Sequence, residues 1–179
     1  DFNIEKNIKN IADSKNKDLT ELTACLLDRP RHKEIIEKLK NLKVNLKLIT
    51  DGDVSGALLV TNPKYNVDIF IGIGGGPEGV LAASALDAFG CKFQGRFLFS
   101  TDEDKNRAKK MGITDLNKKY DLSEIVRGDS IFCATGITTG DLVNGVELKN
   151  NIYHTETLVT HKNSTIDIIK KKVSITWLI

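Results

Sequence analysis

The stretch VDIFIGIGGGPEGV, from Val67 to Val80, decides the fold prediction because an apolar run meets a cluster of glycines there. Short apolar runs rich in Val, Ile and Phe are typical of buried strands. The Ala-rich segment PEGVLAASALDAFG that follows is typical of a helix that ends at a glycine, Gly90. The sequence therefore predicts a strand over 67–73, a glycine loop, and then a helix.

The same order of strand, turn and helix occurs twice more upstream. LTACLL (22–27) and VNLKLI (44–49) are typical strands, and DRPRHKEIIEKLKNL and DGDVSGALLV are turns that open helices. Three such units in about 70 residues predict a layered α/β domain.

The remaining segments complete a single predicted domain. Apolar residues recur at helical spacing and predict a helix over the first fifteen residues: Phe2, Ile4, Ile8 and Ile11. We expect a strand over 92–100, a polar helix over 101–112 with Thr101 as its N-cap, a short helix that leads into a turn within 121–130, and a buried strand over 131–137. The alternating segments YHTETLVTH, STIDIIKKK and SITWLI predict antiparallel strands.

Composition excludes several classes of function. The chain has 179 residues, of which 40% are hydrophobic and 28% charged, as in an ordinary globular domain. A net charge of +2 is too small to predict binding to nucleic acid or a membrane surface, and no apolar run is long enough to span a bilayer.

No signal peptide is visible, and a start at Asp1 rather than Met leaves room for a leader or a longer N-terminal piece. Cys25, Cys91 and Cys133 lie in apolar runs, which predicts buried, reduced thiols in an intracellular protein.

The glycine loop contains the pattern GxGxxG, made by Gly74, Gly76 and Gly79. Dinucleotide-binding folds use such a loop to bring backbone amides against a pyrophosphate. Here Pro77 removes one amide, Glu78 would place a negative charge beside the pyrophosphate, and no acidic residue ends the next strand to hold a ribose. The lysine of a P-loop is also missing, so nucleotide binding of either kind is disfavoured.

Glu78 has two possible roles. The dipole of the helix stabilises a carboxylate in its first turn, so the residue could simply support the helix. It could instead bind a divalent cation that also contacts phosphate oxygens, since Mg²⁺ and Mn²⁺ are typically held by a few carboxylates plus substrate phosphate.

Two other loops carry charged residues after a predicted strand. LDRPRH supplies Arg29 and Arg31, which either bind a phosphate or form a solvated basic turn, while His32 is expected to start a helix. TDGDVSG supplies Asp51 and Asp53, which could ligate a cation, act as a general base or accept hydrogen bonds from sugar hydroxyls. Asp53 could equally be a helix N-cap.

The three loops meet at one edge of the sheet if the strands are parallel, and that edge is where ligands bind in open α/β sheets. Arginines, aspartates and a Gly-Pro-Glu loop together indicate a phosphorylated polyol or sugar with a divalent metal. A fourth loop, ATGITTGDLVNG (134–145), could also contact a ligand, but its composition favours turns.

The ordered set of blocks from about Asp18 to Thr160 resembles the class II fructose-1,6-bisphosphatases, metal-dependent sugar phosphatases related to the inositol monophosphatases. The blocks are LDRPRH, DGDVSGAL, GIGGGPEGVLAASAL, QGRFL, AKKMGI, ATGITTGDLVNGV and HTETLV. The match is weaker beyond Thr165. The resemblance implies a layered α/β sandwich of mixed sheet and helices.

The resemblance also implies an activity, namely hydrolysis of the 1-phosphate of fructose 1,6-bisphosphate in gluconeogenesis, with sedoheptulose 1,7-bisphosphate as a second substrate of some members. It implies Mn²⁺ or Mg²⁺ as cofactor, a homodimer or homotetramer, and a cytoplasmic location. By position it assigns substrate binding to Arg29, Pro30, Arg31, Asp51, Gly52, Asp53 and Gly75, and metal binding to Glu78.

The chain departs from the family in length. Members are roughly twice as long, and their N-terminal half carries most metal ligands, including a D-P-x-x-G-T motif, and the residue that helps activate water. That motif is missing here. The resemblance therefore implies that residues 1–179 form the C-terminal domain, with a leading helix over 1–17 and an α/β domain over 18–179. It also implies that the N-terminal half is the partner of this domain.

Two rival interpretations follow from this departure. One is a non-catalytic module that binds a sugar phosphate or a nucleotide, which would need no metal, whereas a phosphatase requires one. The other is an assembly half-domain whose exposed face is the interface for the absent half.

Overall fold

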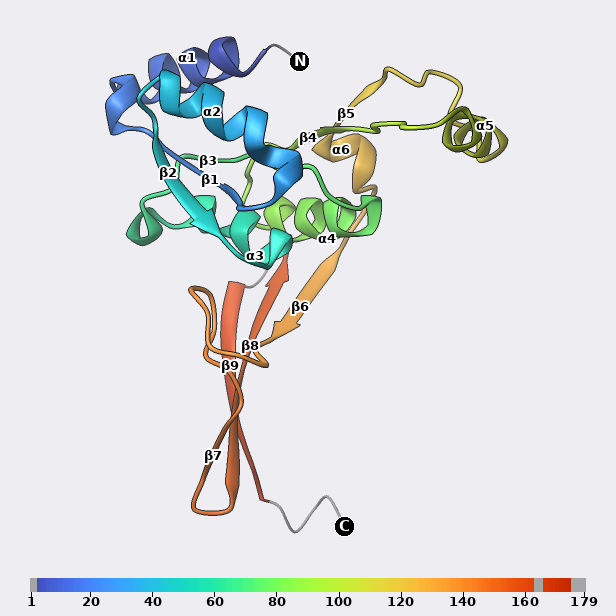
Figure 1. Ribbon diagram of the computed structural model, residues 1–179. Helices are drawn as coiled ribbons and strands as arrows, with labels where there is room; N and C mark the ends of the chain where they lie inside the picture. Colours follow the sequence, from blue (N-terminus) through green and yellow to red (C-terminus); the bar gives the residue numbers. More distant parts are fainter. Residues whose placement is uncertain (1–2, 163–165, 175–179) are drawn as a thin grey trace.

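The computed structural model describes residues 3–162 and 166–174, which form an α/β body, a side arm and a projecting stalk (Figure 1). The helices are α1 (Ile4–Lys15), α2 (Lys33–Asn41), α3 (Asp53–Leu58), α4 (Gly76–Asp87), α5 (Asp102–Lys110) and α6 (Leu122–Ile125). The strands are β1 (Thr23–Leu27), β2 (Asn45–Ile49), β3 (Ile69–Phe70), β4 (Gln94–Arg96), β5 (Lys119–Asp121), β6 (Ile131–Thr135), β7 (Glu147–Lys149), β8 (Ile152–His161) and β9 (Ile166–Ser174). Within these described ranges no helix combines the length and apolar character that crossing a membrane requires.

The body is built on a three-stranded parallel sheet in the order β2-β1-β3, so the condition under which the three loops share one sheet edge is fulfilled. Every residue of the central strand β1 is buried, because helices cover both of its faces. Helices α1 and α2 cover one face through a core cluster of Ile8, Ala12, Leu22, Ala24, Leu26, Ile36, Leu39 and Val44. On the other face, Cys25 packs with Leu59 and Val67.

Helices α3 and α4 lie between this sheet and a second one. Their apolar residues share a core cluster with two residues of the second sheet, Phe132 and Leu158. Gly56 allows α3 to approach the parallel sheet closely, since a Cβ there would lie 2.6 Å from Ile49 Cδ1. The layers therefore follow the order helix, sheet, helix, sheet, as expected for a layered α/β sandwich.

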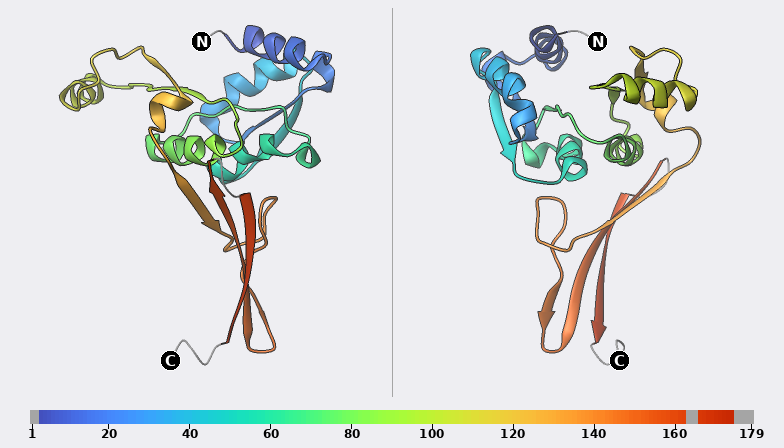
Figure 2. Two further views of the ribbon diagram at one scale, coloured as in Figure 1. Left: turned by 180° about the vertical axis from the view of Figure 1, so that it is seen from behind. Right: turned by 45° about the vertical axis from the view of Figure 1, so that its right-hand side comes forward.

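The second sheet is antiparallel and forms the stalk, and we call it the stalk sheet: β6, β7, β8 and β9. Strand β8 is central, because Thr157 pairs with Thr135 of β6 on one side and with Ile169 of β9 on the other. Strands β6 and β7 share the first edge of β8, and β9 forms the second. Figure 2 shows that only the upper part of this sheet lies against the body.

The side arm contains β4, β5, α5 and α6. Thr101 caps α5 as predicted, since its Oγ1 accepts a hydrogen bond from the Asp104 N–H at 3.1 Å. The strand predicted over 92–100 is much shorter, because only 94–96 pair with β5. Strands β5 and β7 were not predicted, because three residues are too few to show an alternating pattern.

The loop between β6 and β7 consists of turns, as its composition favoured. The N–H groups of Gly140 and Val146 donate to the carbonyls of Val143 and Ile137 at 3.1 Å. The Asn144 N–H also donates to Glu156, and with Lys170 it lowers the pKa of that carboxyl to about 2. The hydrogen bond between Asn144 and Glu156 therefore attaches this loop to β8.

Two sequence expectations about β6 were wrong. The strand was predicted to be buried, but its residues alternate between covered and exposed because helices cover only one of its faces. Cys133 is consequently exposed, whereas Cys25 is buried and Cys91 partly buried. Burial raises the pKa of Cys25 to about 11 and also raises that of Cys91.

The predicted helical residue Phe2 and the end of the last predicted strand, 175–179, lie outside the described residues.

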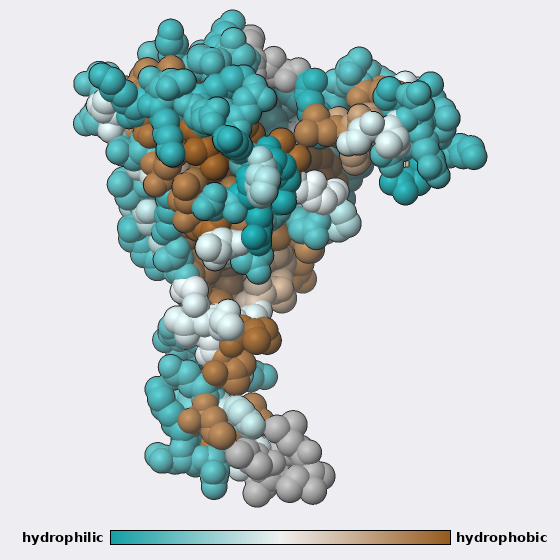
Figure 3. Space-filling model, in the orientation of Figure 1, coloured by the Kyte–Doolittle hydropathy of each residue, from teal (hydrophilic) through white to brown (hydrophobic). Residues whose placement is uncertain are grey.

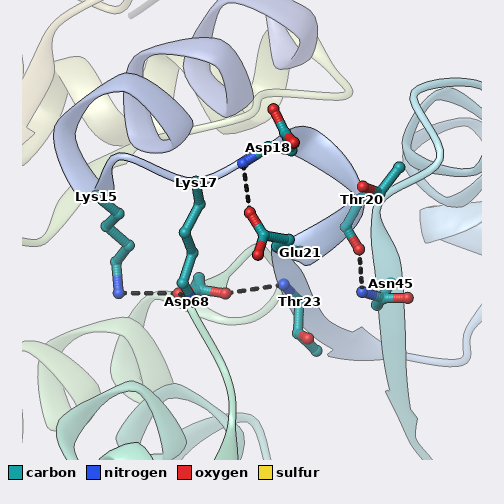
Figure 4. A network of polar contacts seen from close by, with 8 residues as sticks. All are labelled: Lys15, Lys17, Asp18, Thr20, Glu21, Thr23, Asn45 and Asp68. Carbon is teal, nitrogen blue, oxygen red and sulfur yellow. Dashed lines mark hydrogen bonds and ion pairs between the residues drawn. The ribbon is translucent and has the colours of Figure 1, made fainter.

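A buried carboxylate joins α1 to the parallel sheet (Figure 4). Asp68 Oδ1 lies 3.0 Å from Lys15 Nζ and 2.8 Å from Lys17 Nζ, and Oδ2 accepts a hydrogen bond from the Thr23 N–H at 2.9 Å. Burial alone would raise the pKa of Asp68, but these hydrogen bonds outweigh it and hold the pKa below its ordinary value of 3.8. The end of α1, the start of β1 and the segment before β3 are therefore fixed together.

We expect Asp68→Asn to lower the free energy of unfolding at pH 7 by about 1–3 kcal/mol, since it removes a charged partner of two lysines. A lowered folded-state pKa gives stability that is present above the unfolded value and is lost as the pH falls through the folded value. The difference in the free energy of unfolding between the variant and wild type should therefore become smaller below pH 3.8. Urea unfolding of both proteins at pH 7 and at about pH 3 measures this difference. A pH-independent difference, or an equal effect of Asp13→Asn on the exposed side of α1, would contradict this account.

Candidate active site

Three loops follow the carboxyl ends of the parallel strands. Residues 28–32 follow β1, residues 50–53 follow β2, and residues 71–78 follow β3. Because β1 pairs in parallel with both neighbours, all three loops emerge at the same edge of the sheet. The structure thus brings together the segments that the sequence singled out.

His32 links the first loop to the glycine loop. Its side chain is fully buried, and its Nε2 accepts a hydrogen bond from the Ile73 N–H at 2.8 Å. The ring proton is then on Nδ1, which donates to the Leu27 carbonyl at 2.8 Å. The neutral ring therefore connects the last residue of β1 to the loop after β3. The prediction that His32 starts a helix is compatible with this position, because α2 begins at the next residue.

Arg31 strengthens the same link. Its Nε donates to the carbonyl of Ile73, so both Arg31 and His32 hold one residue of the glycine loop. Arg29 and Pro30 are exposed, and Pro30 begins the short 3-10 turn that leads into α2. The first loop therefore has a buried side that fixes the glycine loop and an exposed side that faces solvent.

The second loop approaches the glycine loop through Asp53. A Cβ on Gly74 would lie only 2.5 Å from Asp53 Oδ2, so the carboxylate occupies the space that a side chain at residue 74 would need. Gly52, with a φ of 87°, is the N-cap residue of α3, so the expectation that Asp53 could be that N-cap was wrong. Asp51 Oδ1 accepts a hydrogen bond from the Gly52 N–H at 2.8 Å and is exposed.

Glu78 lies in the first turn of α4, where the helix dipole favours a negative charge. Its carboxylate lies over Gly75, the N-cap residue of α4, so a side chain at residue 75 would collide with it. Gly75 and Glu78 are both exposed. The carboxylate is therefore accessible at the same sheet edge as Arg31 and Asp53.

Sequence reasoning missed Phe97 and gave Gly74 a different role. Gly74 was considered only as the first glycine of the GxGxxG pattern, whereas in the structure it leaves room for the Asp53 carboxylate, whose Oδ2 would lie 2.5 Å from a Cβ at residue 74. Phe97 lies beside the start of α4, where its Cε1 is 3.8 Å from the Cβ position of Gly76. Phe97 is half-exposed and packs against Phe99 and Tyr120, with 5.9 Å between ring centroids in each case. An aromatic residue inside a predicted strand, as Phe97 is in 92–100, is typical of a core, so no separate signal pointed to it.

The described part of the chain does not supply a complete metal site. In residues 3–162 and 166–174, no three His, Cys, Asp or Glu side chains lie close enough together to hold a metal ion. Glu78 offers the carboxylate oxygens that Mg²⁺ or Mn²⁺ prefers, but one carboxylate is too few. The edge can therefore bind an anionic, hydroxyl-bearing ligand, and it can contribute one ligand to a metal held jointly with other residues.

Comparison with known proteins gives a consistent set of relatives. The family model for bacterial fructose-1,6-bisphosphatase, glpX-encoded, matches residues 1–173. A D-fructose 1,6-bisphosphatase class 2/sedoheptulose 1,7-bisphosphatase of Synechococcus sp. (strain JA-2-3B'a(2-13)) is 37% identical over 177 residues, which cover 92% of this chain and 51% of the relative. A fructose-1,6-bisphosphatase class 2 of Haemophilus influenzae is 39% identical over 178 residues, which cover 91% and 53%. The chain thus spans about half the length of the curated relatives it matches.

We expect His32→Phe to lower the free energy of unfolding by about 1–3 kcal/mol, because it leaves the Ile73 N–H without its partner and removes one of the two hydrogen bonds that the Leu27 carbonyl accepts, the other coming from the Arg29 N–H at 3.0 Å. Chemical denaturation followed by circular dichroism measures the change. His32→Gln carries both a donor and an acceptor and should recover part of the loss. Equal stability of the Phe and Gln variants would show that packing, rather than the two hydrogen bonds, is what matters.

Proposed function

Because this chain belongs to the bacterial glpX-encoded fructose-1,6-bisphosphatase family, we propose that it forms the C-terminal part of an enzyme that hydrolyses the 1-phosphate of fructose 1,6-bisphosphate. The products are fructose 6-phosphate and inorganic phosphate, in gluconeogenesis. The observation that carries this proposal is the convergence of two arginines, two aspartates and one glutamate at one sheet edge, in a chain that this family model matches over residues 1–173. Sedoheptulose 1,7-bisphosphate is a second candidate substrate, because the Synechococcus relative is named for both activities.

The roles of the residues follow from their chemistry. The guanidinium groups of Arg29 and Arg31 bind phosphate oxygens, for which their planar donors are suited. Asp51 and Asp53 accept hydrogen bonds from sugar hydroxyls and so orient the ring. Pro30 and Gly52 shape the two turns, and Gly75 lets the substrate approach the backbone at the N-terminus of α4.

Glu78 would hold a divalent cation, Mn²⁺ or Mg²⁺, together with carboxylates from outside this chain. When bound, such a cation activates water and neutralises charge on the phosphoryl oxygens. Glu78 is suited to this role because it is exposed and lies in the first turn of α4. This chain's own contribution is to keep that carboxylate beside the phosphate-binding arginines.

The complete enzyme would contain an N-terminal half that supplies the remaining metal ligands and the residue that activates water. Residues 1–179 would then form its C-terminal domain, with a leading helix over 1–17 and an α/β domain over 18–179. We place the enzyme in the cytoplasm as a homodimer or homotetramer. Support for a reducing compartment comes from the three cysteines, none of which forms a disulfide.

A second candidate function is binding of a sugar phosphate without catalysis. It is favoured by one observation, namely that the described residues hold no cluster of three metal-binding side chains. Phosphate release from fructose 1,6-bisphosphate, measured with Mn²⁺, with Mg²⁺ and with chelator on the longest polypeptide that contains this chain, separates the two functions. Metal-dependent release supports the phosphatase, whereas tight binding of fructose 6-phosphate without any release supports the binding module.

We expect Glu78→Gln in the complete enzyme to lower kcat/KM for fructose 1,6-bisphosphate by at least about 100-fold, because it removes a charged metal ligand with little change in volume. The affinity for Mn²⁺ should fall as well. Glu103→Gln is the matched control, since Glu103 is an exposed glutamate in the first turn of α5, away from the three loops. Near-wild-type turnover of the Glu78 variant at saturating metal would remove Glu78 from the metal site.

We expect Gly74→Ala to raise KM by about 10-fold or more, because the new methyl group displaces the Asp53 carboxylate, and a hydrogen bond to a charged group is worth about 1.5–3 kcal/mol. Stability should change little, since a flexible side-chain end can move aside. Gly79→Ala is the control, because a Cβ at residue 79 has no neighbour within 4 Å. If both variants have the same KM as wild type, Asp53 does not bind the substrate.

A further inference from the structure

Phe97 is a large apolar side chain that lies beside the glycine loop of the candidate site. Its ring approaches the first residue of α4, since a Cβ at Gly76 would lie 3.8 Å from Phe97 Cε1. Gly75, the N-cap residue, directly precedes Gly76, and Glu78 follows two residues later. The ring therefore stands at the N-terminus of α4, next to the residues that the proposed function places against substrate and metal.

Two aromatic neighbours hold this ring in place. Phe99 stacks on it, with 5.9 Å between ring centroids and 27° between ring planes, and Tyr120 of β5 meets it edge to face, at 5.9 Å and 80°. Both arrangements are favoured for aromatic pairs. Lys118 Nζ lies 4.9 Å from the centroid of the Tyr120 ring, which supports Tyr120 in turn. Because these neighbours restrict the ring, little side-chain entropy is lost when a ligand contacts it.

The neighbours do not cover the ring completely. Phe97 is 44% exposed, whereas Phe99 and Tyr120 are less exposed. Figure 3 shows hydrophobic residues at the surface where the side arm meets the body. A ring that is supported by two aromatic residues and is still open to solvent is suited to contact an apolar part of a ligand.

The three loops offer a sugar phosphate mainly charged groups, namely two arginines, two aspartates and one glutamate. These groups suit phosphate oxygens and hydroxyls, but a sugar also has C–H groups, which are best placed against an apolar surface. Small-molecule sites typically combine a few polar groups that fix orientation with hydrophobic and aromatic side chains that cover the rest of the ligand. Phe97 supplies such a surface at the N-terminus of α4.

We propose that Phe97 contacts the substrate by packing its ring against C–H groups of the sugar, and that it thereby favours sugar phosphates over inorganic phosphate. This inference rests on the proposed function, because it takes the site to bind a phosphorylated sugar. The arginines and the N-terminus of α4 recognise the phosphate group in either ligand. The ring gains a C–H contact only from a ligand that carries carbon atoms, so the two ligands separate the role of Phe97 from that of the loops.

Binding of fructose 6-phosphate and of inorganic phosphate tests this role. Isothermal titration calorimetry with Mn²⁺ measures both, on the longest polypeptide that contains this chain. We expect Phe97→Ala to weaken binding of fructose 6-phosphate about 10-fold, because apolar contact area is lost, and to change binding of phosphate by less than about 2-fold. In the phosphatase assay, KM for fructose 1,6-bisphosphate should rise by a similar factor with little change in kcat.

Two further variants serve as controls. Phe97→Tyr keeps a flat ring and should retain most of the affinity for fructose 6-phosphate. Leu98→Ala removes the next side chain along the same segment, an apolar one that is 63% exposed, and should leave both affinities unchanged.

Several outcomes would overturn this proposal. Equal weakening of both ligands by Phe97→Ala would show that the ring only supports the N-terminus of α4. Unchanged binding of fructose 6-phosphate, or an equal loss in Leu98→Ala, would show that the ring does not contact the sugar. The proposed activity is judged separately on the same samples. The expected loss of fructose 6-phosphate binding without metal-dependent phosphate release in wild type would keep the role of Phe97 and remove the proposed enzyme activity.

Discussion

The burial of β1 on both faces is the constraint on which the rest of the structure depends. All five residues of this strand are buried, so helices must lie on both sides of the parallel sheet, and the chain must cross over between strands. The crossovers place α2 on one face, where α1 also packs, and α3 on the other. Because the crossovers make the strands parallel, the three loops that follow them end at one edge. The position of the candidate site is therefore a consequence of the core.

Contacts of His32, Arg31 and Asp53 side chains with neighbouring loops define the shape of that edge. His32 connects β1 to Ile73, and Gly74 leaves room for the Asp53 carboxylate. Arg31 is anchored on the Ile73 carbonyl, and Gly74 and Gly75 leave room for the carboxylates of Asp53 and Glu78. A ligand with several negative charges needs this kind of preorganised edge, because flexible arginines alone lose conformational entropy when they bind.

Much of the body was predictable from sequence because its signals are local. Apolar runs such as 22–27 end at turn residues, and the glycine loop stands directly between a strand and an Ala-rich helix. The role of His32 was not predictable, because its partners Leu27 and Ile73 meet it only through the sheet pairing. The exposure of Cys133 could not be predicted either. An apolar run shows that a strand has apolar faces, but it does not show which layer covers each face, and that layer is absent from the described residues on one side.

The candidate site and the stalk sheet are incomplete in ways that have one common explanation. At the sheet edge, Glu78 has the chemistry of a metal ligand but, within the described residues, lacks the two further ligands that would make a cluster. On the stalk, large apolar residues such as Ile131 and Leu148 are more than half exposed. The first feature concerns charge and the second apolar surface, so neither implies the other. The curated relatives are about twice as long as the matched region, and a further part of the polypeptide would have room to bring carboxylates to Glu78 and to cover apolar residues of the stalk. The family's activity would then depend on an interface as much as on the residues of either half.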